Sequence, residues 1–288
     1  MRLLAPAALC LLATSAWAGS ASAPPAAPPR WVLDFENSLE FGEDSPAGPG
    51  GAIFRSQVSL PLFVPLSSTW RLIGALRGGW SDYESDPFGG SGMETWETGG
   101  LVALDGDFSQ TWSGTFGALG SASWEDGASF SDSWNVGALA LANYRFSPAL
   151  QAGLGALYLT RQGGDDLLVP ALGLDWQVTE QLAVKLYGLD LKATWELSEV
   201  WSVYCHGEFD PRGAQLRVRE GALAETFRDQ GFRTSGGVQW TPCRAFRLAL
   251  EVGCAFHKYN LYDSAEVELI QDRLDPAPFI SLAARLSF

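Results

Sequence analysis

The chain contains few basic residues and lacks the long apolar run of a membrane-spanning helix. Lys and Arg number 19 against 33 Asp and Glu, which leaves a formal net charge of −14 over 288 residues. So acidic a balance argues against binding to nucleic acid and against attraction to anionic lipid. No segment after residue 18 reaches about 20 consecutive apolar residues, which excludes a transmembrane helix there. A membrane location would therefore require a closed barrel of strands.

Cysteine is also scarce, with four in the whole chain, and Cys10 lies in an N-terminal leader. The alternation described below places Cys205 and Cys254 on lipid-facing positions of two strands with another strand between them. Such strands lie about 10 Å apart, too far for a disulfide. Because Cys243 falls in a turn and the three have no metal-ligand spacing, we interpret them as small structural residues. We expect no metal site and no cofactor.

Residues 1–18 have the pattern of a secretory signal peptide. Arg2 supplies the positive charge, Leu3–Ala13 forms a short apolar core, and Ala16–Ala18 matches a small-x-small cleavage site. The apolar core is too short to serve as a bilayer anchor. Residues 19–30 are rich in Pro, Ala and Ser, so we expect an extended tether before a single domain over residues 31–288.

The C-terminal segment Pro278–Phe288 alternates in hydrophobicity with a period of two, which is typical of a strand with one apolar face. That face carries Ile280, Leu282, Ala284, Leu286 and Phe288. The last strand of an outer-membrane barrel pairs with the first and places an aromatic residue at the membrane interface. The segment resembles the C-terminal insertion signal of bacterial outer-membrane β-barrels.

The same alternation continues along the chain and predicts about fourteen strands, or about twelve if two short central ones merge. The clearest strand is Trp70–Trp80, whose two end tryptophans share one face. At about 3.4 Å per residue and a tilt near 45°, they lie roughly 24 Å apart along the membrane normal, close to the apolar band of about 25 Å. Two more segments repeat this device, which predicts an aromatic girdle of Trp70, Trp80, Trp112, Trp124, Trp134 and Tyr144.

Connection lengths alternate between short turns and longer polar stretches. The longer stretches are Gly42–Gly51, Ser81–Thr95, Glu125–Ser133, Asp210–Gly231 and Tyr259–Pro278. Short periplasmic turns and longer outer loops are typical of transmembrane barrels. The predicted fold class is therefore all-β, a single antiparallel transmembrane β-barrel of about 12–14 strands.

From Trp31 to Phe288 the chain resembles the bacterial outer-membrane β-barrel superfamily. Two strand segments, Pro170–Trp176 and Glu199–Tyr204, are also similar to an uncharacterised outer-membrane β-barrel family. The superfamily resemblance implies the barrel fold and a membrane location. The narrower resemblance rests on short motifs and implies no activity.

If the apolar face of each strand meets lipid, the opposite face lines a lumen. The charged candidates on that face are Asp34, Glu36, Glu40, Arg55, Arg71, Arg77, Arg145, Lys185, His206, Glu208, Arg233, Arg247, Glu251 and Arg285. Two interpretations stay open: a water-filled channel with a charge gradient, or a filled barrel whose charges pair with one another. Since the first and last strands must pair, we expect Asp34, Glu36 and Glu40 to lie near Arg285.

These features favour a porin-like passive channel for small solutes or a structural barrel. A barrel enzyme would need a base, and only His206 and His257 exist, both on inward positions. Without a Gly-x-Ser-x-Gly, His-Glu-x-x-His or phosphate-loop motif, a lipid or peptide hydrolase is the weaker alternative, and no catalytic residue is assigned. A loop-mediated binding protein is another alternative, because Ser81–Thr95 and Tyr259–Pro278 are acidic.

Location and partners follow from the two ends of the chain. The signal peptide and the final strand predict export to the outer membrane of a Gram-negative envelope. Expected partners are outer-membrane lipid and the barrel-assembly machinery, which would engage the C-terminal strand.

Overall fold

The computed structural model describes residues 30–42, 51–85, 91–160, 166–218, 224–263, 267–273 and 275–288. The expected signal peptide and all of the expected tether except Arg30 lie outside these residues. The described chain forms sixteen strands and one short 3-10 helix, η1 (Phe130–Asp132). None of the described helical segments is both long and apolar enough to cross a membrane.

The strands follow one another along the chain with these bounds: β1 (Arg30–Phe41), β2 (Ala52–Pro65), β3 (Trp70–Ser85), β4 (Ser91–Asp107), β5 (Trp112–Glu125), β6 (Trp134–Ser147), β7 (Leu150–Leu159), β8 (Leu167–Gln177), β9 (Leu182–Tyr187), β10 (Asp190–Glu196), β11 (Trp201–Gln215), β12 (Ala224–Cys243), β13 (Phe246–Phe256), β14 (Lys258–Asp263), β15 (Glu268–Arg273) and β16 (Ala277–Ser287).

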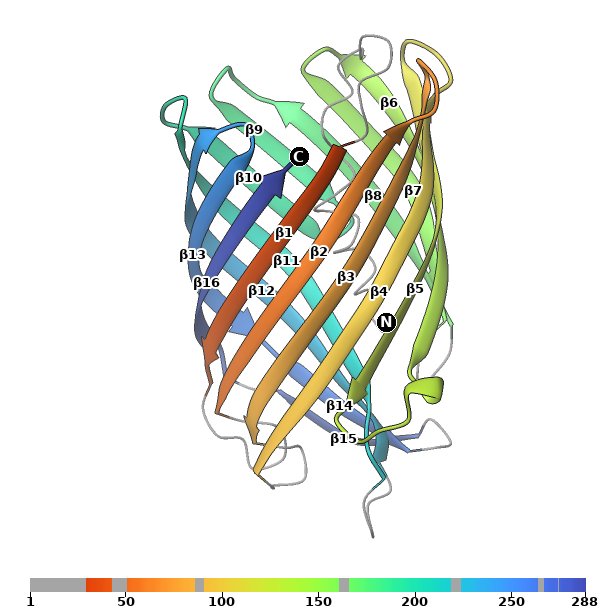
Figure 1. Ribbon diagram of the computed structural model, residues 1–288, viewed down its shortest axis with the longest axis vertical. Helices are drawn as coiled ribbons and strands as arrows, with labels where there is room; N and C mark the ends of the chain where they lie inside the picture. The colour runs from red at the N-terminus through yellow and green to blue at the C-terminus, as the bar shows by residue number, and fades with distance from the viewer. Residues whose placement is uncertain are drawn as a thin grey trace.

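Fourteen of these strands close into an antiparallel barrel (Figure 1). Strands β1 to β11 pair in sequence, β11 pairs with β12, β12 with β13, β13 with β16, and β16 with β1. Strands β14 and β15 continue β13 and precede β16, and they extend the sheet along the far part of β12. The expected barrel is confirmed, with the larger of the two predicted strand numbers.

The exterior is apolar because alternate residues of each strand point away from the ring. Leu76, Val102 and Leu154 are 60–64% exposed, while their chain neighbours Ala75, Leu101 and Ala103 are nearly buried. The predicted C-terminal signal lies on the same exterior face, with Ile280, Leu282 and Leu286 39–47% exposed and Phe288 73% exposed. A continuous apolar exterior suits lipid, because the closed ring leaves no unpaired edge.

Aromatic residues gather in two bands on this exterior. At one height Trp112 packs against Tyr144 with ring centroids 4.9 Å apart, and Trp70 packs against Phe108 at 5.7 Å. At the other height Trp80 pairs with Trp96 across β3 and β4, and Trp96 pairs in turn with Trp124 on β5. The predicted girdle residue Trp134 is half exposed and contacts Phe130 beside the second band. Two bands of this kind are typical of the two interfaces of a membrane barrel.

Short turns lie at the end of the barrel that holds the C-terminus, which we call the turn end; the opposite end is the loop end (Figure 1). Four of the short turns use a hydroxyl to fix their backbone. Ser67, Ser109, Thr179 and Ser198 each accept an N–H from the residue three positions later, over 3.0–3.1 Å. Such hydroxyl-to-backbone bonds stabilise tight turns, which explains why the strands reverse there.

Three segments predicted as long loops lie largely in strands. Ser81–Thr95 contains the end of β3 and the start of β4. The segments predicted as long loops at Asp210–Gly231 and Tyr259–Pro278 contain the end of β11, the start of β12, and strands β14 and β15. Asp210, Arg212 and Asp229 are held by contacts inside the barrel, described below, so polarity at these positions does not mean solvent exposure. Conversely, β9 and β10 are only 6 and 7 residues long and are joined at the loop end by Gly188 and Leu189 alone.

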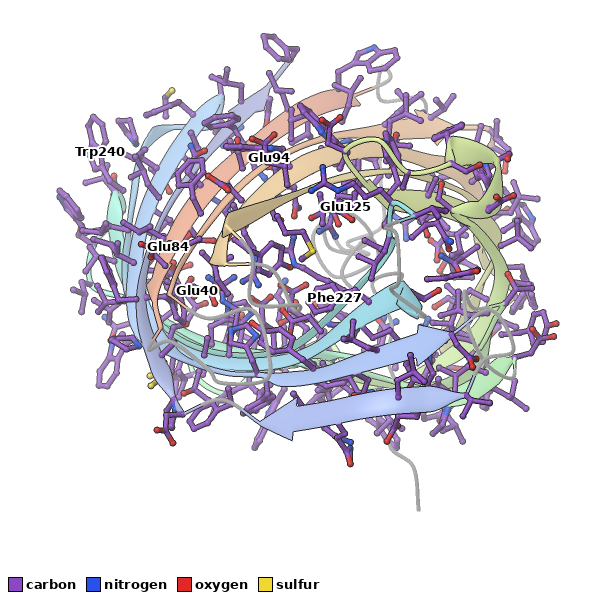
Figure 2. The ribbon with its side chains drawn as sticks, turned by 90° about the horizontal axis from the view of Figure 1, so that it is seen from below. Glu40, Glu84, Glu94, Glu125, Phe227 and Trp240 are labelled. Carbon is purple, nitrogen blue, oxygen red and sulfur yellow. The ribbon has the colours of Figure 1, made fainter. Side chains whose placement is uncertain are left out.

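The loop end is narrowed because opposite walls meet there. Gln215 on β11 pairs with Trp124 on β5, across the ring. Beside this contact, Tyr83 of β3 and Phe227 of β12 pack edge to face with centroids 5.7 Å apart, and both are 1% exposed. Seen from the loop end, Phe227 lies inside the ring and Trp240 outside it (Figure 2).

Candidate functional site in the lumen

The inner wall has two sectors of different chemistry. We call the inward apolar residues of β3–β8 the apolar sector: Ile73, Ala75, Leu101, Ala103, Leu119, Leu139, Leu157, Leu159 and Ala171. We call the inward charged residues of β9–β13, β16, β1 and β2 the polar sector: Asp34, Glu36, Glu40, Arg55, Lys185, Asp190, Lys192, His206, Glu208, Arg233, Arg247, Glu251 and Arg285. Most charged side chains of the lumen therefore lie along one side, and β3 and β4 add the pairs Arg71–Asp105 and Arg77–Glu97.

A layer of buried ion pairs crosses the lumen near the loop end, and we call it the ion-pair layer. Arg55 on β2 pairs with Glu40 on β1 and reaches Asp229 on β12 over 3.1 Å. The ring of His257 lies between the same two carboxylates, with Nδ1 2.8 Å from Asp229 and Nε2 2.6 Å from Glu40. These side chains are at most 4% exposed. Buried charges persist only when each is paired, so the layer must form as a unit.

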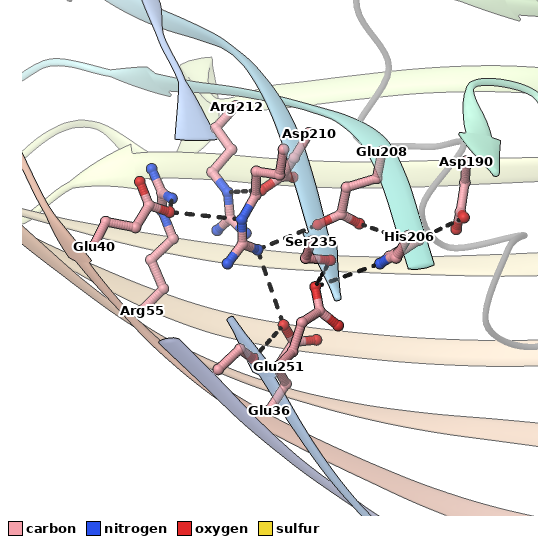
Figure 3. Close-up of polar contacts among 12 residues, drawn as sticks. Glu36, Glu40, Arg55, Asp190, His206, Glu208, Asp210, Arg212, Ser235 and Glu251 are labelled. Carbon is pink, nitrogen blue, oxygen red and sulfur yellow. Dashed lines mark hydrogen bonds and ion pairs between the residues drawn. The ribbon is translucent and has the colours of Figure 1, made fainter. Parts of the chain in front are cut away.

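The layer continues on β11, where Arg212 lies beside Asp210 (Figure 3), and from there it reaches the opposite wall. Arg212 donates to Asp210 over 2.9 Å and to the hydroxyl of Ser81 over 3.4 Å. It also lies 3.7 Å from Glu97 on β4, which accepts a 2.8 Å bond from Arg77 on β3. The bent ends of β11 and β12 are thus tied electrostatically to β2, β3 and β4.

A cavity of about 190 Å³ lies between the ion-pair layer and the turn end, along the polar sector. Its lining reaches from Arg77, Asp210 and Arg212 at the layer to Asp34 and Arg285 beside the closing seam. Groups of both signs face it, so the space suits water and polar solutes.

The middle of this cavity holds a cluster around His206 (Figure 3). Its Nε2 lies 2.9 Å from Asp190 and 3.9 Å from Glu208, and its Nδ1 lies 3.6 Å from Glu251. Glu251 accepts hydrogen bonds from Ser235 over 2.5 Å and from Tyr204 over 3.0 Å. The imidazole is therefore held between carboxylates from three strands.

The two histidines do not form a nucleophile–base pair in the described residues. Both imidazole rings contact carboxylates. The hydroxyl of Ser235, beside the His206 cluster, donates its hydrogen bond to Glu251. Glu251 also contacts His206, not His257, although alternation alone puts it on the same face as His257. A Ser–His arrangement would need the hydroxyl to donate to the imidazole, so the geometry gives no support to the hydrolase alternative.

The expected seam between the first and last strands forms around Asp34. Asp34 and Arg285 are register partners, and the Arg285 Nη2 donates to Asp34 over 2.8 Å. Glu36 accepts from Ser281 over 3.1 Å instead. Glu40 lies farther along and contacts Arg55 and His257, so the acidic row does not share one arginine.

The other predicted lumen residues differ in their surroundings. Arg77, Arg233 and Arg247 line the cavity, and Arg247 lies directly opposite Arg285 in the β13–β16 register. Three others make local contacts outside the cavity: Arg71 with Asp105 at 2.5 Å, Lys185 with Asp175 at 3.6 Å, and Arg145 with the carbonyl of Gln110 at 3.5 Å.

Sequence reasoning missed Asp190, Asp210, Arg212 and Asp229. Asp190 begins a strand directly after a turn, and the other three lie in a stretch that was predicted to be a loop. A period-two pattern of charged residues across Asp210–Arg212 and Glu208 was the available signal.

No protein-family model and no curated protein matches the chain. Solved structures with a similar fold include a NanC porin, with 10% identity, a TM-score of 0.41, and coverage of 88% of this chain and 98% of that chain. The translocator domain of the autotransporter NalP from Neisseria meningitidis has 10% identity, a TM-score of 0.41, and coverage of 91% of this chain and 89% of that chain. A Pseudomonas aeruginosa FadL homologue has 8% identity, a TM-score of 0.48, and coverage of 90% and 89%. Closure, apolar exterior and aromatic bands define the chain as a transmembrane β-barrel of the outer-membrane class.

Proposed function

We propose that the protein is a porin-like channel that passes small polar solutes along the polar sector. The observation that carries this proposal is the cavity of about 190 Å³, lined by charged groups of both signs from the ion-pair layer to the closing seam. A barrel built only for structure gains nothing from a charged cavity, because partly satisfied buried charges cost free energy. The apolar sector gives such solutes no hydrogen-bond partners, so the route runs along β9–β13, β16, β1 and β2.

The ion-pair layer is the barrier on this route. Arg212 joins Asp210 of its own strand to Glu97 of the opposite wall. Solutes pass when such pairs separate, so the layer acts as the constriction of the channel. The same layer also favours the second candidate, a closed structural barrel, because it fills the lumen between the walls.

Single-channel conductance of the refolded barrel in a planar bilayer separates the two candidates. We expect discrete steps from the wild type and larger steps from Arg212→Ser, since Glu97 keeps its pair with Arg77 in that variant. Arg71→Ser is the matched control, because Arg71 pairs with Asp105 outside the cavity, and its steps should equal those of the wild type. If wild type and Arg212→Ser are both folded and inserted yet silent, the channel is refuted and the structural barrel stands.

A further inference from the structure

Three side chains on β10 and β11 aim their ligand atoms at one point in the cavity. Asp190, His206 and Glu208 each offer one nitrogen or oxygen, and these atoms all lie within 4.8 Å of one another. His206 and Glu208 are two positions apart on β11 and so share its inner face. Sequence spacing did not reveal this cluster, because its members come from two strands.

The two carboxylates of the cluster face each other across the strand pair. Leu191 pairs with Gly207 in register, which makes Asp190 and Glu208 cross-strand neighbours. Like charges directly opposite one another destabilise a sheet. A positive group between these two carboxylates would therefore stabilise the strand pair. Nε2 is the imidazole nitrogen of His206 that faces both of them.

The opposite nitrogen of His206 is oriented by a second carboxylate layer. Nδ1 faces Glu251 at 3.6 Å, and Glu251 is itself fixed by Ser235 and Tyr204. Histidines that bind metals commonly donate their second ring N–H to a carboxylate, which fixes the tautomer and leaves the other nitrogen as a ligand. In the structure Nε2 lies 2.9 Å from Oδ1 of Asp190, a carboxylate oxygen that can only accept, so Nε2 carries the N–H there. A bound cation would replace this proton at Nε2, and a proton on Nδ1 would then face Glu251.

The neighbouring cationic side chains, Arg233 and Lys192, do not contact the oxygen of Glu208 that faces His206. Arg233 donates to Oε1 of Glu208 over 3.2 Å, whereas Oε2 is the oxygen that faces His206. Lys192 lies over the ring of Tyr204, with Nζ 3.7 Å from its centroid.

His257 shows what a purely structural histidine looks like in this barrel. Its two carboxylate partners, Asp229 and Glu40, contact opposite nitrogens of the ring, so their oxygens do not converge on one point. It is 4% exposed and lies in the ion-pair layer, whereas His206 lines the cavity.

We propose that Asp190, His206 and Glu208 bind a divalent transition-metal ion in the lumen. One imidazole nitrogen and two carboxylate oxygens are a ligand set suited to Zn²⁺, with the remaining position filled by water from the cavity. Mg²⁺ and Ca²⁺ prefer all-oxygen sites and bind more weakly there. This site does not depend on the proposed channel function.

The test is calorimetric titration of Zn²⁺ into the refolded barrel, with Mg²⁺ as the comparison ion. Cys205, Cys243 and Cys254 are replaced by Ser in every sample, because exterior thiolates also bind Zn²⁺. We expect one site per chain, which His206→Gln and Glu208→Gln each weaken at least about tenfold. Glu251→Gln, which disturbs only the orienting carboxylate, should weaken it about tenfold.

Glu36→Gln is the matched control, because it removes the same charge from the same cavity without touching the three ligands. Its affinity for Zn²⁺ should equal that of the parent protein. A circular dichroism spectrum shows that each variant is folded. The proposal fails if the parent lacks a stoichiometric site, if folded His206→Gln binds equally well, or if Glu36→Gln weakens binding as much as Glu208→Gln.

Discussion

Leu101 in the apolar sector and Arg55 in the polar sector both point into the barrel, and they are 2% and 3% exposed. Leu101 packs among Ile73, Leu119 and other aliphatic groups, none of which needs a specific partner. Arg55 needs both Glu40 and Asp229, because each of these charges is buried. The apolar sector therefore tolerates small changes in side-chain volume, whereas the polar sector depends on every buried charge keeping its partner.

The apolar sector also relies on close approach of neighbouring strands. A Cβ on Gly117 would lie 2.8 Å from the Cβ of Ala103 on β4, closer than packed carbon atoms allow. Glycine at this position lets β4 and β5 place Ala103 and Leu119 against the rest of the sector. The shapes of the side chains determine the packing of the apolar sector, whereas paired charges hold the polar sector together.

The largest expected effect is the loss of Arg55. Arg55→Leu leaves Glu40 and Asp229 buried without their main counter-charge, which should lower the free energy of unfolding by about 3–5 kcal/mol. Urea unfolding of the barrel in lipid vesicles measures it. Arg71→Leu is the control: the Arg71 side chain is 34% exposed, so its loss should cost about 0–1 kcal/mol. Equal losses for the two variants would contradict the special status of the ion-pair layer.

A smaller effect is expected from a cavity in the apolar sector. Leu157 is fully buried, and Leu157→Ala should cost about 2–3 kcal/mol, because no charge is stranded and the wall can partly relax. The same unfolding measurement applies. Leu154→Ala, on the lipid face and 64% exposed, is the matched control and should cost less than half as much. A larger loss for Leu157→Ala than for Arg55→Leu would reverse the comparison.

The smallest effect should occur at the closing seam. Arg285→Ala removes the pair with Asp34, but it also removes a like charge directly opposite Arg247. These two effects oppose one another between partly buried side chains, so the cost should stay below about 1 kcal/mol. Unfolding in low and high salt would check this, and a loss like that of Arg55→Leu would show that the seam controls stability.

Much of the fold follows from the sequence because alternation and aromatic spacing act locally. Trp70–Trp80 alone predicts a tilted strand of membrane height, and the pairing of the first strand with the last follows from ring closure, although only Asp34 of the predicted acidic row meets Arg285. The apolar sector is harder to predict. Leu101–Leu104 is apolar on both faces, so a period of two cannot distinguish the lumen side from the lipid side.

The ion-pair layer could not be predicted, because it depends on contacts between walls. Arg55 meets Asp229 across 174 positions of sequence, through a bend of β12 into the ring. Asp210 and Arg212 look like loop residues in the sequence, but they lie on β11, and Arg212 reaches Glu97 on the opposite wall. The cluster at His206 likewise requires the β10–β11 register, which hydropathy does not specify.

The short strands β9 and β10 have a consequence for the surrounding bilayer. A wall of 6 residues, as in β9, rises only about 14 Å along the membrane normal at a tilt near 45°, against an apolar band of about 25 Å. Beside it, β8 begins to pair with β9 only at Gly173, and Leu168 is 71% exposed. This hydrophobic mismatch should thin the lipid locally and give the barrel a preferred side for contact with a neighbouring membrane protein.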